Sequence, residues 1–361
     1  MLPTCNHGRN PTERMNDSRC LRRIILELML LPALLHAQWF RQTSNTTERL
    51  RAVSVVNESV AWASGNHGTC VRTTDGGILW QAARVPDADS LDFRDVEAFN
   101  DQLAFVLSIG PGELSRIYKT TDGGSSWVMK YIATDPRIFL DEFAFWDSDH
   151  GIAVGDELDG HLFLLRTDDG GEHWERVSPS KLPKTLPGEG AFAASGSGIT
   201  VHGSGNVWIG TGVKAARVFH STDRGETWDV SVTPLIHETE SSGIFSVAFC
   251  DSLSGIIVGG DYKRENAARD NAALTNDGGR SWVSVKQNPP SGFRSGVMYL
   301  TKDYLITVGP SGSDFSNDGG RKWKQIDMIG YHAVGKARVG NAIWAVGEKG
   351  RIGHFVDLIV R

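Results

Sequence analysis

The chain has 361 residues, of which 22% are charged, and a formal net charge of −6 at pH 7. This acidic balance, without a run of Lys and Arg interleaved with aromatic residues, argues against nucleic acid as a partner. Its 41 glycines and 11 tryptophans, with no long apolar stripe of helical period, favour an all-β protein of short strands and tight turns.

A leader is expected at the N-terminus. Residues 22–37 join two arginines to an apolar run and end on alanine, a pattern typical of a secretory signal peptide. A transmembrane helix is the alternative, but the apolar run 24–35 is short for a bilayer. The sequence predicts a leader over 1–37 and a single exported domain over 38–361, periplasmic or extracellular and without a membrane span. Removing the five basic and three acidic residues of the leader shifts the net charge from −6 to −8.

Six copies of one motif, Ser/Thr-x-Asp-x-Gly-x-x-Trp, follow along the chain. Their aspartates are Asp75, Asp122, Asp169, Asp223, Asp277 and Asp318. Successive aspartates are 47, 47, 54, 54 and 41 residues apart, a period that matches a four-stranded propeller blade. This is the Asp-box, or BNR, repeat. The aspartate accepts hydrogen bonds from turn amides and the glycine allows a positive φ, so we expect structural hairpins rather than six acids or metal ligands.

A second repeated element, a short apolar strand ending in glycine or a small residue, occurs seven times, one more than the boxes. Its last copy begins at Ile343 and is followed by one further strand near 351–355. The missing fourth strand is available in residues 38–43, which contain Trp39. The sequence therefore predicts a seven-bladed β-propeller with Asp-box hairpins, whose ring is closed by the N-terminal strand.

A binding site is expected on the face opposite the boxes, where the long loop 259–271 lies. In blade 4 the innermost strand, predicted over 188–198, consists almost entirely of small residues, which would leave room for a pocket beside the axis. Asp141 and His332 occupy comparable positions in blades 3 and 7. The candidates for contact with a ligand or partner are Glu189, Ser195, Asp261, Tyr262, Arg294, Arg51 and Arg94. The alternative is that the carboxylates cap loops and the arginines are solvated.

Cofactor and metal sites are not indicated. Cys70 and Cys250 fall on blades 1 and 5, too far apart for a disulfide, and no Cys/His cluster has metal-ligand spacing. No Gly-x-Gly-x-x-Gly opens a helix after a strand, so nicotinamide or flavin binding has no support. We expect neither a metal nor a cofactor.

The six boxes and seven glycine-ended strands resemble the photosystem II stability/assembly factor family over roughly residues 38–356. The segments 188–196, 217–225, 259–262 and 293–297 are similar to the bacterial, non-photosynthetic branch of that group, whose members are variously described as assembly-factor-like, glycosyl hydrolases or oxidoreductases. The photosynthetic members are exported to the thylakoid lumen and bind a photosystem II precursor protein. The resemblance implies a protein-binding scaffold.

Three functional classes follow, in order of preference. The first is a monomeric, non-catalytic scaffold that binds a protein or glycan. The second is a glycoside hydrolase, which needs paired carboxylates that Glu189 and Asp261 would supply if their loops converge. A sialidase would need an arginine triad, but no Phe-Arg-Ile-Pro-type segment occurs, since Arg94 and Arg294 are followed by Asp and Ser. An oxidoreductase is third. An arginine beside two carboxylates favours their ionised forms, which suits binding better than acid catalysis.

Overall fold

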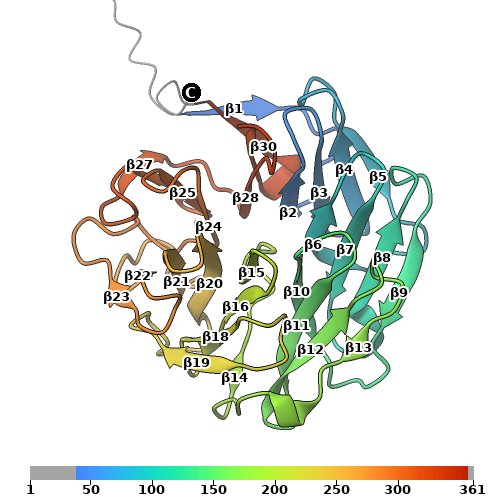
Figure 1. Ribbon diagram of the computed structural model, residues 1–361. Helices are drawn as coiled ribbons and strands as arrows, with labels where there is room; N and C mark the ends of the chain where they lie inside the picture. Colours follow the sequence, from blue (N-terminus) through green and yellow to red (C-terminus); the bar gives the residue numbers. More distant parts are fainter. Residues whose placement is uncertain (1–37, 357–361) are drawn as a thin grey trace, which may run out of the picture. The chain divides into compact units, whose positions relative to one another are not determined.

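The computed structural model describes residues 38–356. The leader predicted over 1–37 lies outside the described residues. Within this part of the chain, the strands form seven antiparallel sheets arranged as blades around a common axis (Figure 1). The prediction of an all-β, seven-bladed propeller is confirmed.

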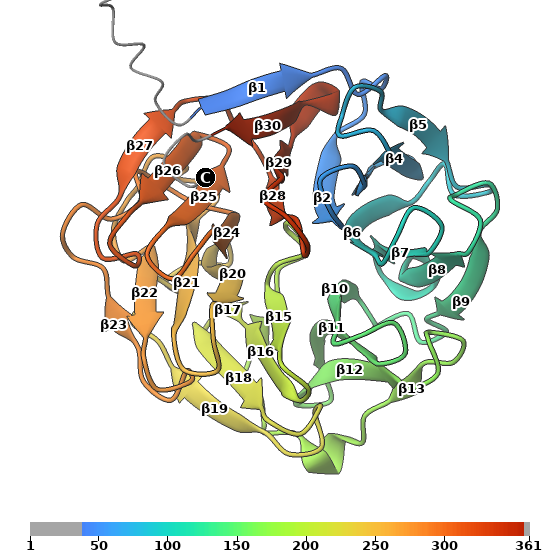
Figure 2. The same cartoon turned by 45° about the horizontal axis from the view of Figure 1, so that its top comes forward.

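Each blade has its strands in chain order from the axis outward, except where the ring closes (Figure 2). Blade 1 consists of β2 (Leu50–Val55), β3 (Ala61–Gly65), β4 (Thr69–Thr73) and β5 (Gln81–Arg84). Blade 2 consists of β6 (Asp92–Ala98), β7 (Ala104–Ile109), β8 (Arg116–Thr120) and β9 (Val128–Ile132). Blade 3 consists of β10 (Leu140–Phe145), β11 (Gly151–Leu158), β12 (His161–Thr167) and β13 (Glu175–Arg176).

The remaining blades depart more from this pattern. Blade 4 consists of β15 (Ile199–His202), β16 (Asn206–Gly210), β18 (Arg217–Ser221) and β19 (Asp229–Val232). Blade 5 consists of β20 (Ser242–Phe249), β21 (Gly255–Asp261), β22 (Ala272–Thr275) and β23 (Val283–Ser284), extended at its inner edge by β17 (Gly212–Val213) and β14 (Glu189–Gly190). Blade 6 consists of β24 (Gly296–Tyr299), β25 (Leu305–Gly309), β26 (Gly312–Ser316) and β27 (Lys324–Asp327). Three 3₁₀ turns are found in the described residues: η1 (Gly112–Leu114), η2 (Pro179–Lys181) and η3 (Glu348–Gly350).

Blade 7 joins the two ends of the described chain. It consists of β28 (Ala333–Lys336), β29 (Ile343–Val346), β30 (Ile352–Val356) and β1 (Gln38–Gln42). Strand β1 lies beside β30 (Figure 2) and pairs with it antiparallel, with Trp39 opposite Phe355. The N-terminal strand therefore closes the ring as predicted, and the edge of β30 is covered.

The second strand of each blade is buried on both sides because neighbouring blades pack against it. Its aromatic side chains fill the space between blades: Trp344 of β29 lies 5.2 Å, ring centroid to centroid, from Trp80 of the first box. A Cβ on Gly77 would approach Trp344 to 2.2 Å, and one on Gly171 would approach Phe105 to 2.5 Å. The second glycine of a box is thus required both by its positive φ and by the aromatic ring of the preceding blade.

The boxes have the hydrogen bonds of structural turns. In the first box the Thr73 hydroxyl donates to Asp75 Oδ1 at 2.9 Å and accepts the Gly77 N–H at 2.9 Å, while Asp75 Oδ1 accepts the Leu79 N–H at 3.0 Å. The other five boxes repeat this pattern. In the second box, hydrogen bonds from the hydroxyl and amide of Ser126 lower the pKa of Asp122 to about 2.

Thr73→Val is expected to lower the free energy of unfolding by about 1–3 kcal/mol, because the buried Gly77 N–H loses its acceptor while the side-chain shape is kept. The measurement is the free energy of unfolding from urea titration, with the m-value the same for both proteins. Thr74→Val is the matched control, since Thr74 is exposed and should tolerate the change within about 0.5 kcal/mol. Equal effects of the two substitutions would contradict the structural role of the box.

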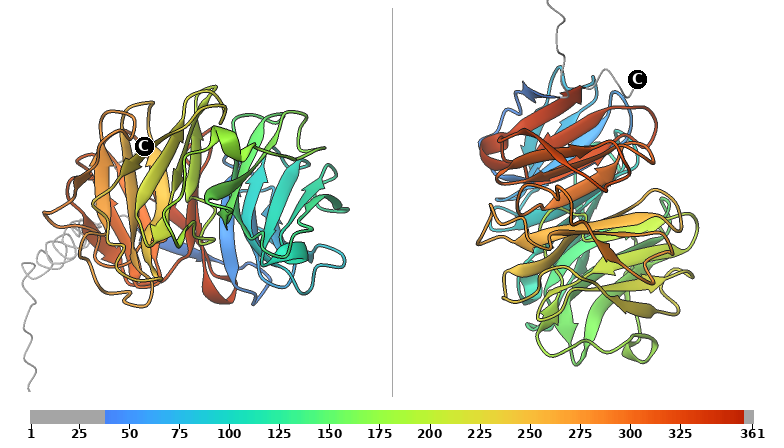
Figure 3. Two further views of the ribbon diagram at one scale, coloured as in Figure 1. Left: turned by 90° about the horizontal axis from the view of Figure 1, so that it is seen from below. Right: turned by 90° about the vertical axis from the view of Figure 1, so that its left-hand side faces the viewer.

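The two faces of the ring carry different loops (Figure 3). The boxes lie beside the turns between first and second strands, as in the hydrogen bond from Gly76 N–H to the Ser59 carbonyl. The opposite face, here called the cavity face, carries the loops between second and third strands and the connections between blades. These loops are also bonded to each other, for example from Gly68 N–H to the Leu91 carbonyl. The Asp boxes therefore lie on one face of the ring and the longer loops lie on the other, as expected.

Candidate functional site

The residues predicted as the innermost strand of blade 4 have a different structure. Only Ile199–His202 form that strand, β15, which lies in the interior of the ring in Figure 1. Glu189–Gly190 form β14 and pair with β17 instead. Residues 191–198 between them, here called the axial segment, are irregular.

The axial segment is hydrogen-bonded to five other blades. Its carbonyl groups accept from Arg51 of blade 1 at Ala194 and from Arg94 of blade 2 at Ala193, both at 2.7 Å. The further contacts are from Gly198 N–H to Glu142 of blade 3, from Val247 N–H of blade 5 to the Ser197 carbonyl and from the Ser195 hydroxyl to the Ser295 carbonyl preceding blade 6. The segment therefore spans the middle of the ring.

Small residues are needed here for the backbone to fit. A Cβ on Gly196 would lie 2.2 Å from Asp95 Oδ1, and one on Gly198 would lie 2.9 Å from Glu142 Oε2. What differs from the prediction is that these small residues do not form a regular innermost strand. They let the chain itself occupy the space beside the axis, and the result is a floor rather than a channel.

A cavity of about 1060 Å³ lies above this floor on the cavity face. It is lined by residues from all seven blades, with Ala191–Ala194 at its base. Three kinds of side chain surround it. They are the arginines Arg49, Arg51, Arg94 and Arg351, the carboxyl groups Asp141, Asp156, Glu265 and Glu348, and the aromatic rings Phe139, Phe192, Phe245, Tyr262 and Phe293.

β-Bulges place several of these side chains. The pairing of the first two strands skips one residue in blades 1, 2, 3 and 5, and the skipped residues are Arg51, Arg94, Asp141 and Phe245. All four line the cavity. A bulge turns one side chain out of the regular alternation of a strand, so the same irregularity, repeated around the ring, directs a different residue of each blade into one cavity.

The four arginines, here called the arginine pole, concentrate positive charge. Burial and the guanidinium groups of Arg94 and Arg49 lower the pKa of Arg51 to about 9. Burial and the guanidinium groups of Arg51 and Arg49 lower the pKa of His332 to about 2, so this cavity residue is neutral. Two carboxylates compensate part of this charge: Asp92 pairs with Arg94 at 2.7 Å, and Glu348 lies 3.9 Å from Arg49. An anion entering here would relieve unfavourable repulsion between arginines.

An aromatic wall borders the cavity near blades 4 to 6. Phe192 stacks on Phe245 with ring centroids 3.9 Å apart, and Phe293 meets Phe245 edge to face at 4.6 Å. Tyr262 completes the group and is 43% exposed. Such a wall offers apolar contact area to a bound group at low entropic cost.

The structure separates the predicted candidates into two sets. Arg51, Arg94 and Tyr262 line the cavity. Ser195 lies in the axial segment, where its hydroxyl donates to the Ser295 carbonyl at 2.6 Å. The other three, Glu189, Asp261 and Arg294, were expected to face the pocket and do not.

These three residues are buried in separate structural networks. Glu189, 2% exposed, is paired with Arg217 and accepts from Thr211 at 2.6 Å. Asp261, 3% exposed, accepts from the Ser241 hydroxyl at 2.6 Å and the Lys263 N–H at 3.0 Å. The predicted convergence of one arginine on these two carboxylates is therefore wrong, because each group is already neutralised or capped by its own neighbours.

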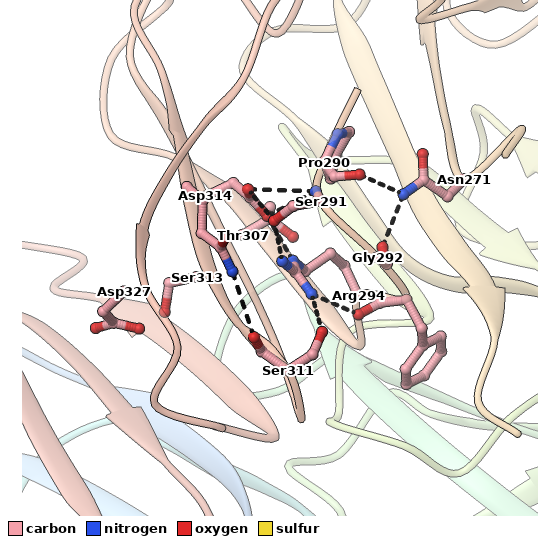
Figure 4. Close-up of polar contacts among 12 residues, drawn as sticks. Asn271, Pro290, Ser291, Gly292, Arg294, Thr307, Ser311, Ser313, Asp314 and Asp327 are labelled. Atoms are coloured by element: carbon pink, nitrogen blue, oxygen red, sulfur yellow. Dashed lines mark hydrogen bonds and ion pairs between the residues drawn. The ribbon is translucent and has the colours of Figure 1, made fainter. Parts of the chain in front are cut away.

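Arg294 is held on all sides within blade 6 (Figure 4). Its Nε donates to Asp314 Oδ2 at 2.6 Å, and its two Nη groups donate to Ser291, Ser311 and the Phe293 carbonyl. Asn271 holds the same segment through the carbonyls of Pro290 and Gly292. This network fixes the backbone that presents Phe293 to the aromatic wall.

The sequence is 29% identical over 270 residues to a protein named photosystem II assembly lipoprotein Ycf48, from Synechococcus sp. (strain CC9902). The match covers 71% of this chain and 69% of that protein. This match supports distant homology to the Ycf48-like photosystem II assembly factors. No family model matches it.

Solved structures confirm the fold of this Ycf48-like propeller. It is similar to a structure described as YCF48 bound to D1 peptide, with a TM-score of 0.62, 18% identity and coverage of 90% of this chain and 99% of that one. For YCF48 from Cyanidioschyzon merolae the TM-score is 0.58 at 14% identity, and the match covers 88% of this chain and 98% of that one. For the WD40 propeller domain of Doa1 the TM-score is 0.61 at 11% identity, and the match covers 91% of this chain and 99% of that one. Likeness at these identities extends to the propeller fold alone.

Several cavity residues of the Ycf48-like propeller were not among the predicted candidates. They are Arg49, Asp156, Phe192, Phe245 and Arg351. One signal was present in the sequence: Asp156 directly follows Gly155, the glycine that ends a second strand. The bulges leave no sequence pattern of their own, so Phe245 was indistinguishable from a core residue.

No helix among residues 38–356 is long and apolar enough to cross a bilayer. Over that range, no group of three or more His, Cys, Asp or Glu side chains is arranged to hold a metal ion. Cys70 and Cys250 are both free thiols.

Glu142 is a buried carboxyl group that holds the axial segment, and its ionisation makes the stability of the fold depend on pH. Its carboxylate accepts N–H groups from Gly198 and Ile199, yet burial raises its pKa to about 7 from an ordinary value of 4.5. The folded state of this Ycf48-like propeller therefore binds that proton more tightly than the unfolded chain does. Ionisation of Glu142 between these two values opposes folding, so its contribution to stability is lost as pH rises.

Glu142→Gln is expected to become more stable relative to wild type as pH rises from 4.5 to 8, by about 3 kcal/mol in all. The measurement is the difference in unfolding free energy between Glu142→Gln and wild type at each pH. Comparing this difference between pH values removes the part of the substitution's effect that does not depend on pH. Histidines of lowered pKa, such as His332, affect both proteins equally. A difference that does not change with pH would contradict the assignment.

Proposed function

We propose that this chain is an exported, non-catalytic propeller that binds a segment of a partner protein in the cavity. The observation that carries the proposal is the arginine pole, an open site in which blades 1, 2 and 7 direct four guanidinium groups toward one volume, close enough that burial and their mutual repulsion lower the pKa of Arg51. Guanidinium groups recognise carboxylates through charge-assisted, often bidentate hydrogen bonds. The partner segment therefore carries acidic side chains or a terminal carboxylate.

The relatives support a protein as the partner class. One similar structure is described as YCF48 bound to a D1 peptide, and the Synechococcus relative is named as an assembly lipoprotein. The dimensions agree, since a cavity of about 1060 Å³ has room for several residues of an extended chain. Recognition of an extended segment by a rigid scaffold needs no catalytic group.

The hydrolase alternative loses the pair of carboxylates on which it rested. Glu189 is engaged by Arg217 away from the cavity. Burial raises the pKa of Asp261, but hydrogen bonds from Ser241 and Lys263 outweigh it and leave the pKa below its ordinary value. A general acid needs the opposite shift, so this pair does not have the properties of a glycosidase site.

The test is co-purification from an extract of the native host. Arg49 is the residue of choice because it is only loosely paired, 3.9 Å from Glu348. We expect Arg49→Glu to lose the partner that wild type retains, and added salt to weaken the wild-type complex. Arg84→Glu is the matched control, since Arg84 is an exposed, paired arginine outside the cavity. Retention by Arg49→Glu, or loss by Arg84→Glu alone, would overturn the proposal.

Export is tested separately. A leader over 1–37 predicts that the mature protein begins near Gln38, the first residue of β1. N-terminal sequencing of the protein from its native host decides this. A chain that retains residues 1–37 in the cytoplasm would refute export while leaving the binding proposal intact.

A further inference from the structure

Two carboxyl groups face the arginine pole from blade 3, and both lie at irregular strand positions. Asp141 is the bulge residue of β10, skipped between the pairs Leu140–Gly155 and Glu142–Val154. Asp156 is skipped in the pairing of β11 with β12, between Gly155 and Glu157. Consecutive bulges on adjacent strands thus direct two carboxyl groups into the same cavity.

Asp141 has an unmet hydrogen-bonding group. It is 2% exposed, it lines the cavity, and its Oδ2 has no hydrogen-bond partner. Asp156 accepts only a 3.2 Å hydrogen bond from the Ala191 N–H. Buried polar atoms in native proteins are almost always paired, so an unpaired one on a residue that lines a cavity calls for a further partner, such as a water or a bound group.

The charges around the pair explain what would satisfy it. Burial, then Asp156 and Glu142, raise the pKa of Asp141 well above its ordinary value, and a hydrogen bond from the Ala193 N–H and the charge of Arg94 of β6 only partly offset them. Burial and Glu157 raise the pKa of Asp156 to about 6, against the Ala191 hydrogen bond. Arg94 is itself held by Asp92 and the Ala193 carbonyl. An additional cation would stabilise both carboxylates in their ionised forms.

We propose that Asp141 and Asp156 form a cation subsite that binds an ammonium or guanidinium group of the partner segment. This inference rests on the proposed function and adds a specificity to it: the segment carries a basic group placed for blade 3 and acidic groups placed for the arginine pole. An organic cation fits better than a metal ion, because no third metal-ligating side chain joins the pair among the described residues. The rings of Phe139 and Phe192 also line this cavity and suit an organic cation.

The cation must displace protons from the two carboxyl groups, so its binding depends on pH. Below pH 6 Asp156 is protonated and the attraction is weak. As pH rises toward 6 binding strengthens by up to roughly tenfold per unit of pH for each proton released, and it levels off once the free carboxyl group is ionised. A site built only from aromatic contacts would show no such dependence.

The experiment uses methylguanidinium chloride and sodium acetate as separate probes of the full-length protein, followed by NMR of carboxyl-labelled aspartate. We expect methylguanidinium to lower the pKa of Asp141 and Asp156 and to bind at least fivefold more tightly at pH 7 than at pH 5. Asp141→Asn and Asp156→Asn are each expected to weaken it at least fivefold. Asp327→Asn is the matched control, because Asp327 is a half-buried carboxyl of raised pKa outside the cavity.

The two probes separate the two proposals. Acetate binding that Arg49→Glu removes, together with no methylguanidinium binding, would overturn the cation subsite and leave the arginine pole intact. Methylguanidinium binding without acetate binding or a protein partner would support the subsite and count against the proposed function. Equal sensitivity to Asp327→Asn, a pH-independent affinity, or glycoside turnover abolished by Asp141→Asn would each overturn the cation subsite.

Discussion

Trp39→Ala is expected to lower the free energy of unfolding by about 3–5 kcal/mol, the range for deleting a buried tryptophan side chain. Trp39 is 8% exposed, and its ring lies 5.0 Å from the rings of both Tyr331 and Phe355. Its Nε1 donates to the Ser313 hydroxyl of blade 6 at 3.0 Å. The residue therefore joins β1 both to its own blade and to the neighbouring one.

The control lies in the same strand. Phe40 is 43% exposed, so Phe40→Ala should change stability by less than about 1 kcal/mol. Deleting residues 38–43 altogether should expose the edge of β30 and cause aggregation, measured by light scattering during thermal unfolding. Equal losses for Trp39→Ala and Phe40→Ala would mean that closure depends on the strand backbone and not on the tryptophan.

Arg294→Met is the second change with a large expected effect, a loss of about 3–5 kcal/mol. Arg294 and Asp314 are 0% and 1% exposed, and the ion pair between them has no access to water. Removing the arginine leaves the Asp314 carboxylate buried with only Ser291 as a partner. The loss is measured by chemical denaturation.

A double substitution tests the cause of that loss. Arg294→Met with Asp314→Leu removes both charges, so it should recover a large part of the stability lost by Arg294→Met alone. Arg264→Met is the control. Arg264 is exposed and forms a long ion pair with Asp261, at 3.7 Å, and ion pairs of exposed side chains contribute about 0–1 kcal/mol. A double variant no more stable than the single one would show that packing, not the unpaired charge, dominates.

The arrangement of the cavity explains how one fold serves recognition. The ring and the axial segment make a rigid base, and blades 1, 2, 3 and 5 each contribute one side chain at an equivalent bulge. Changing one of these residues alters the cavity without disturbing the strand ladder around it. Arg51 and Arg94 are exceptions, because they also hold the axial segment through the carbonyls of Ala194 and Ala193.

The architecture was predictable because it depends on local, repeated chemistry. Each box carries its own acceptor, its own glycines and its own tryptophan, so six copies at a blade-length period specify six hairpins independently of the rest of the chain. Counting the glycine-ended strands yielded the seventh blade, and the tryptophan in 38–43 identified its closing strand. These inferences needed no knowledge of which blade contacts which residue.

The site depended on contacts between residues far apart in the chain. Whether Glu189 faces a ligand or Arg217 is decided by a residue 28 positions away, and Arg294 is neutralised by Asp314 of β26, 20 positions away. Small residues in 191–198 were recognised as unusual, but the sequence alone did not show whether they leave space or fill it. That outcome was decided by tertiary structure, because five other blades supply the hydrogen bonds that draw this segment across the axis.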